Sequence, residues 1–375
     1  MHVAQINFQC APPGRTAAEV LEQWPSLSII AETAAGAGVR VSVLQAATSA
    51  ERVIRDAVDY HFIDCGNSGT AEQRAAHFAR TAAAVNAEVL HVHGLGFARE
   101  AFALTRHLPK VPLLIQDHAD RPPRWWRRPR WRRWYAAAAG VTFTAPDLGL
   151  PFTADGMFRS HTRVFAIPEC STRFTPGSRA AARAATGLHG EPCVLWVGHL
   201  SAGKDPLTVL EGVASAAERL SGLQLWCAFG SAPLFAEVQR RIAGDSRLAG
   251  RIHLLGKVPH AEVEILLRAA DLFVSGSRAE GCGYAALEAL ACGIPPVITD
   301  IPAFRSLTGS GRVGHLWPCG DAARLAAALV NAASARPSAH QLRAHFDAEL
   351  SFTAVGRQWA AAYSRLLGVP GRREG

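Results

Sequence analysis

The chain has 375 residues and a mass of 40.0 kDa, more than one hydrophobic core usually organises, so two domains are expected. Hydrophobic residues make up 49% of the chain and charged residues 19%, which excludes a largely disordered protein. The formal net charge is +8 at pH 7, and seven arginines lie between Arg121 and Tyr135. No apolar run approaches the roughly 20 residues of a bilayer-spanning helix, so a membrane-spanning protein is also excluded.

The eight cysteines are scattered without a C-x-x-C pair, and no segment has the charged start, apolar core and cleavage site of a secretory signal. These features predict a cytoplasmic protein. Peripheral attachment at the inner face of the membrane stays open because of the arginine-rich segment.

The first half of the chain alternates between short β-branched runs and Ala-rich segments long enough for helices. Strands are expected at 3–8, 39–44, 89–92, 111–115, 141–144 and 164–167, with helices at 71–87 and 98–108. This alternation is typical of a parallel sheet that is covered by helices on both faces.

The same pattern restarts in the second half. Strands are expected at 193–197, 223–229, 252–255, 272–274 and 296–299, with helices at 206–220, 234–242, 261–270, 284–291 and 322–333. The predicted fold class is therefore α/β, with two doubly wound parallel-sheet (Rossmann-like) domains. Ligands of such sheets bind beyond the carboxyl ends of the strands, so the cleft between the domains is expected to hold the site.

The predicted domains are residues 1–174 and 193–350, joined by a linker at 175–192 that contains Pro and Gly and has weak periodicity. Two further helical stretches follow Pro337, and residues 351–375 are expected to form a separate C-terminal helix.

The stretch S-G-S-R-A-E-G-C-G-Y-A-A-L-E-A-L-A-C-G at 275–293 reads as a strand end, a loop and a helix. Gly281 and Gly283 allow backbone N–H groups to approach a ligand at a helix N-terminus, which carries partial positive charge. This arrangement predicts an anion site. Glu288 lies roughly 7 Å along the helix from Gly283, within reach of hydroxyls beside a bound phosphate. An ordinary strand-to-helix turn with solvated glutamates is the alternative.

A second loop of the same kind follows the strand at 193–197. The sequence V-L-W-V-G-H-L-S-A-G-K-D-P places Lys204 beside a helix that opens at Pro206. A flexible ammonium at that position can reach a phosphate. A surface or capping lysine is the alternative.

These two segments resemble the family 4 retaining nucleotide-sugar glycosyltransferases (glycosyl transferases group 1). E-G-C-G-Y-A-A-L-E is similar to the family's E-x7-E signature, and G-H-L-S-A-G-K-D-P is similar to its G-R-L-x-x-x-K stretch. V-L-H-V-H-G at 89–94 and I-P-E-C-S-T-R-F-T-P at 167–176 resemble two further family segments. The resemblance implies a GT-B fold with the donor held mainly by the second domain, and a terminal helix that crosses back to the first.

The resemblance also implies roles for individual residues. Glu280 would bind hydroxyls of the donor sugar and Glu288 the ribose of the nucleotide. Lys204 would hold the diphosphate together with the amides of the loop that begins the helix. The implied donor-binding residues are Gly198, His199, Lys204, Gly281, Cys282, Gly283, Tyr284 and Glu288. No cofactor and no metal ion are expected, and the partner is a nucleotide-diphosphate sugar.

Three departures from the family pattern stand out. His199 replaces the usual arginine, so one positive charge becomes conditional on protonation. The segment 11–14 replaces a Gly-Gly turn after the first strand, which leaves acceptor recognition open. The segment 301–305 replaces a second Gly-Gly turn, which leaves Arg305 as an additional candidate contact to phosphate.

His118 ends a predicted strand of the first domain, where it can face the cleft, and family members place a functional histidine at the corresponding position. We therefore expect His118, Lys204 and Glu280 to be the catalytic residues. A satisfied loop histidine is the alternative for His118. His91 and His93 share one side of their strand, but two imidazoles alone predict a structural or acceptor-lining role rather than a metal site.

The expected function is transfer of a sugar from a nucleotide-diphosphate sugar to an unidentified acceptor, with retention of anomeric configuration and without a metal. The resemblance implies front-face attack, in which the leaving phosphate takes the acceptor's proton. The alternatives are a catalytically silent nucleotide-, membrane- or nucleic-acid-binding protein and a sugar-nucleotide epimerase of the same fold. The sequence does not identify the donor base, the sugar or the acceptor, which can be a glycan, a lipid-linked or a small molecule.

The segment R-P-P-R-W-W-R-R-P-R-W-R-R-W-Y, residues Arg121 to Tyr135, has three interpretations. It can be a packed loop with buried tryptophans and outward arginines. It can contact a membrane surface or a lipid-linked acceptor. It can also bind acceptor phosphates or nucleic acid, of which nucleic acid is the least favoured. Its prolines restrict any helix to a short one from Pro129 onward.

Overall fold

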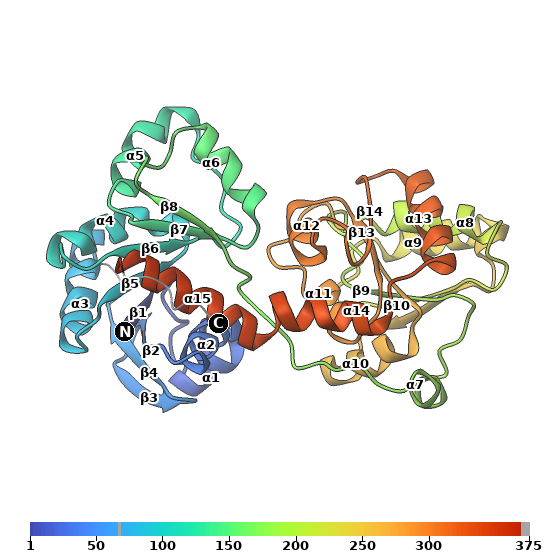
Figure 1. Ribbon diagram of the computed structural model, residues 1–375, viewed down its shortest axis with the longest axis horizontal. Helices are drawn as coiled ribbons and strands as arrows, with labels where there is room; N and C mark the ends of the chain where they lie inside the picture. The colour runs from blue at the N-terminus through green and yellow to red at the C-terminus, as the bar shows by residue number, and fades with distance from the viewer. Residues whose placement is uncertain (67–68, 369–375) are drawn as a thin grey trace. The chain divides into compact units, whose positions relative to one another are not determined.

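The computed structural model describes residues 1–66 and 69–368. The described chain divides into two compact units. Unit 1 contains Met1–Cys170 and the chain from Phe352 onward, and unit 2 contains Ser171–Ser351. Each unit is built on its own sheet with helices on both faces (Figure 1). The prediction of two parallel α/β sheets is confirmed.

The sheet of unit 1 has the strand order β3-β4-β2-β1-β5-β6-β7-β8. All neighbouring strands pair in parallel except β3 and β4, which form an antiparallel hairpin. The strands are β1 (His2–Asn7), β2 (Arg40–Ala47), β3 (Glu51–Arg55), β4 (Val58–Asp64), β5 (Val89–His93), β6 (Leu113–Gln116), β7 (Gly140–Phe143) and β8 (Arg163–Ala166).

The hairpin of β3 and β4 is not among the expected strands. Its turn is Asp56-Ala57, and both residues have positive φ, of 48° and 62°. Two-residue turns of this kind are usually marked by Asn-Gly or Asp-Gly. With alanine in the second position, the sequence carries no recognisable turn signal.

Helices cover both faces of the first sheet. They are α1 (Ala17–Gln23), α2 (Pro25–Gly36), α3 (Ala71–Ala84), η1 (Leu95–Phe97), α4 (Ala98–His107), η2 (Trp125–Arg127), α5 (Arg128–Tyr135), η3 (Pro146–Gly149), α6 (Leu150–Ala154) and α15 (Phe352–Leu366). Val3 of β1 belongs to the core beneath α1, α2 and α15, whereas the adjacent Ala4 belongs to the core beneath α3 and α4. This alternation of faces follows from the two-residue period of a strand.

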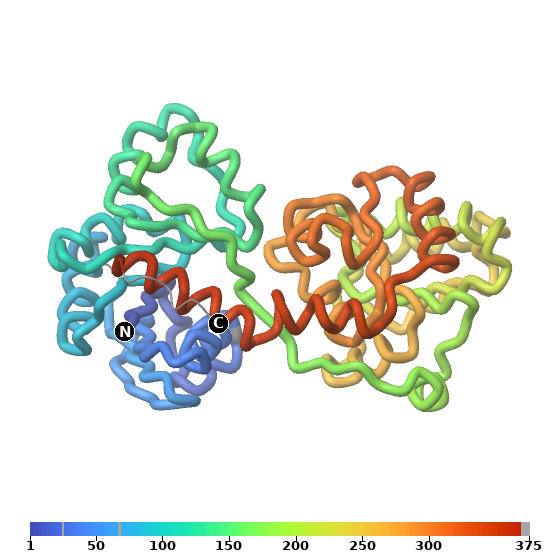
Figure 2. The backbone as a smooth tube through the Cα atoms, viewed as in Figure 1, coloured from blue at the N-terminus to red at the C-terminus, as the bar shows by residue number. Residues whose placement is uncertain are grey.

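The C-terminal helix α15 packs against α2 in unit 1, so two segments from opposite ends of the sequence lie side by side (Figure 2). Gly356 makes this approach possible, because a Cβ atom there would lie 2.5 Å from the carbonyl oxygen of Thr33. Trp359 and Tyr363 are both fully buried in the core beneath α15. The C-terminal segment is thus an integral part of unit 1.

The sheet of unit 2 is parallel throughout, with the order β11-β10-β9-β12-β13-β14. Its strands are β9 (Cys193–Val197), β10 (Gln224–Ala228), β11 (Ile252–Gly256), β12 (Leu272–Ser275), β13 (Pro296–Thr299) and β14 (His315–Trp317). Its helices are α7 (Arg179–Thr186), α8 (Pro206–Ala217), α9 (Phe235–Ala243), η4 (Ser246–Leu248), α10 (His260–Ala269), α11 (Tyr284–Ala291), α12 (Pro302–Thr308), α13 (Ala322–Ser334), α14 (Ala339–His345) and η5 (Phe346–Leu350).

The range 175–192, expected to be a linker, lies in unit 2 and contains α7. Arg183 of this helix donates hydrogen bonds to the Asp271 carboxylate at 2.8 Å and to the Ala269 carbonyl at 3.0 Å. Asp271 immediately precedes β12, so these bonds attach α7 to the sheet.

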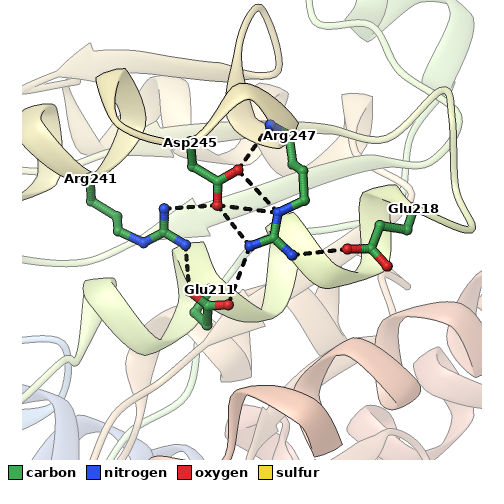
Figure 3. A network of polar contacts seen from close by, with 5 residues as sticks. All are labelled: Glu211, Glu218, Arg241, Asp245 and Arg247. Carbon is green, nitrogen blue, oxygen red and sulfur yellow. Dashed lines mark hydrogen bonds and ion pairs between the residues drawn. The ribbon is translucent and has the colours of Figure 1, made fainter.

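A surface network of charges holds α8 in place (Figure 3). Asp245 pairs with Arg241 of α9 at 2.9 Å and with Arg247 of η4 at 2.8 Å. Both arginines also pair with Glu211 of α8, and Arg247 reaches Glu218 at 2.9 Å. Hydrogen bonds from the Arg247 side chain and backbone hold the pKa of Asp245 well below its ordinary value. The network therefore ties α8, α9 and η4 together.

Burial predicts very different costs for two tryptophans of unit 1. Trp359→Ala should lower the free energy of unfolding by about 3–5 kcal/mol, because it removes a fully buried ring from the core beneath α15. Urea unfolding followed by circular dichroism measures this change. Trp125→Ala is the matched control, since that side chain is 73% exposed and should cost little. Equal costs for the two variants would contradict the packing of α15 in unit 1.

Candidate functional site

Two loops meet at the carboxyl end of the sheet in unit 2. The first follows β9 and contains Gly198, His199 and Lys204, and the second follows β12 and runs from 276 to 283. Because β9 and β12 are adjacent and parallel, both loops leave the same edge of the sheet. The amide of Arg278 donates to the carbonyl of Gly203 at 2.9 Å, which joins the two loops directly.

The second loop ends where α11 begins. Gly283 is the N-cap residue with φ of 74°, and a Cβ atom there would lie 2.7 Å from the ring of Phe304. Both the backbone conformation and the ring therefore require glycine. The expected helix start after Gly283 is confirmed. The N-terminus of α11, with its partial positive charge, lies at the end of a loop that also contains Gly281 and Cys282.

Lys204 and Glu280 form an ion pair across the two loops. Their side chains are 28% and 16% exposed, so the pair is only partly accessible to solvent. A second pair joins the same loops, between Arg278 and Asp205 at 2.7 Å. Asp205 also caps α8 by accepting from the amide of Thr208. The ammonium and the carboxylate that the sequence predicts for the site are therefore in direct contact with each other.

Glu288 lies on α11 with its side chain almost fully buried. The Nε2 atom of His260, at the start of α10, lies 2.6 Å from its Oε1 atom. Burial raises the pKa of Glu288, while the hydrogen bond from His260 opposes that rise. The His260 ring is 73% exposed and stacks on Phe174 with 5.2 Å between ring centroids. Sequence reasoning missed His260, because no local pattern relates it to Glu288, 28 residues later.

His199 and Arg305 are each held by a local partner. The amide of Ser231 donates to Nδ1 of His199 at 3.1 Å, so Nε2 is the ring nitrogen left to act as a donor. The Arg305 guanidinium, on α12, binds the Asp300 carboxylate in two places, at 2.5 and 3.0 Å. These bonds fix the orientation of both side chains.

Unit 1 contains a chain of histidines at the ends of β5 and β6. His118 Nδ1 lies 3.0 Å from the Glu169 carboxylate, and His118 Nε2 lies 3.1 Å from His93 Nδ1. If Glu169 accepts the Nδ1 proton of His118, then Nε2 of that ring accepts from His93. His93 in turn stacks on His91, with 4.6 Å between the centroids. In the sequence Glu169 lies only within the segment 167–176 that resembles the family, and no local pattern relates it to His118.

The two inner histidines of this chain are buried and uncharged. Burial lowers the pKa of His91 to about 3 and lowers that of His93 well below its ordinary value. His91 Nδ1 lies 2.8 Å from the hydroxyl of Tyr363 on α15. In the described part of the chain, no group of three or more His, Cys, Asp or Glu side chains is arranged to hold a metal ion.

A cavity of about 420 Å³ lies at these strand ends in unit 1. Its lining includes Asn7, Trp24, His93, Phe97, His118 and Asp120. Asp120 is held in place because it accepts from the amide of Leu95 at 2.9 Å. Asp117 accepts from the amide of Asp120 at 2.8 Å, and burial raises its pKa to about 6. The turn that carries His118 is therefore fixed from both sides.

Comparison with known proteins identifies the chain's relatives. Residues 178–346 match the family model "Glycosyl transferases group 1". The GDP-mannose:cellobiosyl-diphosphopolyprenol alpha-mannosyltransferase of Xanthomonas campestris is 28% identical over 309 residues, which cover 77% of each chain.

Two solved structures are similar over almost the whole chain. The sucrose-phosphate synthase of Thermosynechococcus elongatus has a TM-score of 0.69 at 19% identity and covers 98% of this chain and 99% of its own. The Anabaena HepE structure in complex with UDP also has a TM-score of 0.69 at 19% identity, with coverage of 97% and 100%. The fold that these likenesses identify is GT-B. Residues 178–346 belong to the glycosyl transferases group 1 family of retaining glycosyltransferases, which transfer a sugar from a nucleotide sugar.

Proposed function

We propose that unit 2 binds a nucleotide-diphosphate sugar at the loops after β9 and β12, and that the sugar passes to the acceptor with retention and without a metal ion. The observation that carries this proposal is the convergence of Lys204, Glu280 and the N-terminus of α11 at one edge of the sheet. Unit 1 is the proposed acceptor side.

The ion pair between Lys204 and Glu280 supports separate roles for its two members. Without donor, each neutralises the other in a partly buried position. A bound diphosphate offers the Lys204 ammonium a stronger anionic partner, and donor-sugar hydroxyls can then donate to the released Glu280 carboxylate. We propose these two contacts for the diphosphate and the sugar.

The remaining donor contacts follow from the same edge. The amides from Gly281 to Tyr284 and the α11 N-terminus are the proposed ligands of the phosphate oxygens, as in other anion sites at helix N-termini. The Nε2 atom of His199 is proposed to donate in place of the family's arginine, with Gly198 leaving space beside it. Glu288 is the proposed partner of the ribose hydroxyls, where a ribose would replace the hydrogen bond from His260.

The chemical step places growing negative charge on the departing nucleotide diphosphate. Once the Lys204 ammonium has exchanged Glu280 for the diphosphate, it stabilises that charge together with the α11 N-terminus, in the manner of an oxyanion hole. We propose that the leaving phosphate accepts the proton of the attacking hydroxyl. His118 is the proposed catalytic residue of unit 1: its Nδ1 atom stays on Glu169, and a hydroxyl of the sugar substrate replaces His93 at its Nε2 atom.

The acceptor is proposed to be lipid-linked. The relative from Xanthomonas campestris, which matches over 77% of the chain, is named for a diphosphopolyprenol acceptor. A lipid-linked acceptor would place the enzyme at the inner face of the cytoplasmic membrane. The described chain contains no helix that is long and apolar enough to cross a bilayer.

Lys204→Ala should lower kcat by about 10²- to 10³-fold, because it removes a fixed positive charge from the leaving group. Hydrolysis of a panel of UDP-, GDP- and ADP-sugars measures the effect and also identifies the donor base. Lys257→Ala is the matched control, since Lys257 is an exposed lysine of the same unit. An unchanged kcat in Lys204→Ala would contradict the proposed role.

Glu288→Ala should abolish saturable binding of the matching nucleoside diphosphate, measured by calorimetry. In the unaltered protein, binding should strengthen as pH rises through the pKa of Glu288, which burial raises above its ordinary value. The sign follows because the carboxylate accepts from ribose hydroxyls at both oxygens, whereas the protonated form turns one oxygen into a donor and is the weaker acceptor. Glu262→Ala, an exposed glutamate on α10, should bind normally. If Glu288→Ala bound the nucleoside diphosphate as well as the unaltered protein, the proposed ribose contact with Glu288 would be wrong.

Transfer activity should persist in the presence of excess EDTA. The physical reason is that Lys204 and the α11 N-terminus supply the positive charge that a divalent ion would otherwise supply. Initial rates before and after chelation, with Mg²⁺ and Mn²⁺ added back, measure this independence. An absolute requirement for an added divalent ion would refute the proposed metal-free mechanism.

A further inference from the structure

The segment 121–135 is firmly attached to unit 1 at its C-terminal end. Trp131 and Trp134 of α5 pack against the core beneath α4, and the buried Tyr135 donates to the carbonyl of Leu95 at 3.2 Å. Arg128 pairs with the Asp155 carboxylate at 2.6 Å, and Arg132 donates to the carbonyl of the same residue at 2.7 Å. This end of the segment fits the interpretation as a packed loop.

The N-terminal end of the same segment is different. Trp125 and Trp126, in η2, are 73% and 53% exposed. Pro122 and Pro123 precede this short helix, and none of its three residues is buried. Two adjacent tryptophans left in water beside two that are packed indicate a surface with a function of its own, because large exposed aromatic groups mark interaction sites. The packed-loop interpretation is therefore correct for only half of the segment.

Unpaired positive charge surrounds the two exposed rings. Arg121, Arg124, Arg127 and Arg130 are all exposed, and none of them forms an ion pair within the described residues. The sequence contains no Asp or Glu from 121 to 146. We call the six residues Arg121, Arg124, Trp125, Trp126, Arg127 and Arg130 the basic-aromatic surface. Its charge is complementary to an anionic partner.

We propose that the basic-aromatic surface binds the surface of an anionic phospholipid bilayer. Tryptophan prefers the boundary between headgroups and acyl chains, and arginine pairs with headgroup phosphates, so the two residue types suit the same layer. The chain contains no spanning helix among its described residues, so attachment of this kind is peripheral. The proposal does not depend on the donor chemistry. Binding to the bilayer would bring the enzyme to the surface where a lipid-linked acceptor is located.

The ring geometry favours a bilayer over a nucleic acid. Bases stack on open aromatic faces. Here the guanidinium of Arg124 lies 5.3 Å from the centroid of the Trp126 ring and covers one of its faces. The rings of Trp125 and Trp126 meet edge to face at 88°, so they offer no pair of parallel faces for successive bases. Insertion of the ring edges among headgroups has no such requirement.

The test is sedimentation of the full chain with vesicles. Vesicles of phosphatidylglycerol and phosphatidylcholine should carry the protein down at low salt, and pure phosphatidylcholine vesicles should bind it far less. Binding to the anionic vesicles should weaken as salt rises. The triple variant Arg124→Ser, Arg127→Ser, Arg130→Ser should bind about 100-fold more weakly, at about fivefold for each arginine. Trp125→Ser with Trp126→Ser should also weaken binding, and in the unaltered protein the tryptophan fluorescence should shift to shorter wavelength on the vesicles.

Matched controls separate this surface from general charge and hydrophobicity. Arg219→Ser with Arg324→Ser and Arg357→Ser removes three exposed arginines from elsewhere, and Ile54→Ser removes a 71% exposed apolar side chain. Both controls should bind vesicles normally. All the variants should hydrolyse donor sugar in solution at the normal rate, so failure of the proposed transferase function is scored separately. Equal loss in surface and control variants would overturn the proposal, as would binding to single-stranded DNA or RNA but not to vesicles.

Discussion

The candidate site depends on one constraint, which is the parallel pairing of β9 with β12. Parallel neighbours end at the same edge of a sheet, so the loops that follow them must lie together. The bond from the Arg278 amide to the Gly203 carbonyl and the contact of Lys204 with Glu280 both result from this adjacency. If the two strands were not neighbours, Lys204 and the N-terminus of α11 could not contact the same anion.

Because the charged residues of the candidate site are partly buried, each of them depends on a polar or charged partner. A partly buried charge that loses its partner raises the free energy of the protein. Such a charge therefore stays paired until a ligand group of suitable charge or polarity replaces the partner. Glu280 and Glu288 are both in this condition, with Lys204 and His260 as their present partners. The same principle applies in unit 1, where Glu169 holds the imidazole of His118 beside a cavity. In our proposal Glu169 stays on His118, whereas Lys204, Glu280 and Glu288 exchange their present partners for groups of the donor.

Much of the architecture was predictable from the chain alone. Strand and helix periodicity, together with turn glycines, predicted both parallel sheets, and the start of α11 after Gly283 was expected correctly. The hairpin of β3 and β4 was missed, because its Asp56-Ala57 turn adopts positive φ without glycine. On sequence alone, the segment Arg121 to Tyr135 has three interpretations, since composition does not distinguish a packed tryptophan from an exposed one. The exposures of Trp125 and Trp131 differ because only the latter packs on the core.

The sequence by itself determined which segments form strands and helices, which loops are rich in glycine and which of them contain a lysine or a glutamate. These are local properties, set by backbone preferences and by the spacing of apolar residues over a few turns. Only the tertiary structure decided that His260 meets Glu288, that Glu169 meets His118, and that the histidine chain reaches Tyr363 of the last helix. Such pairs join residues far apart in the chain, and their contacts follow from how the elements pack, which no local pattern encodes.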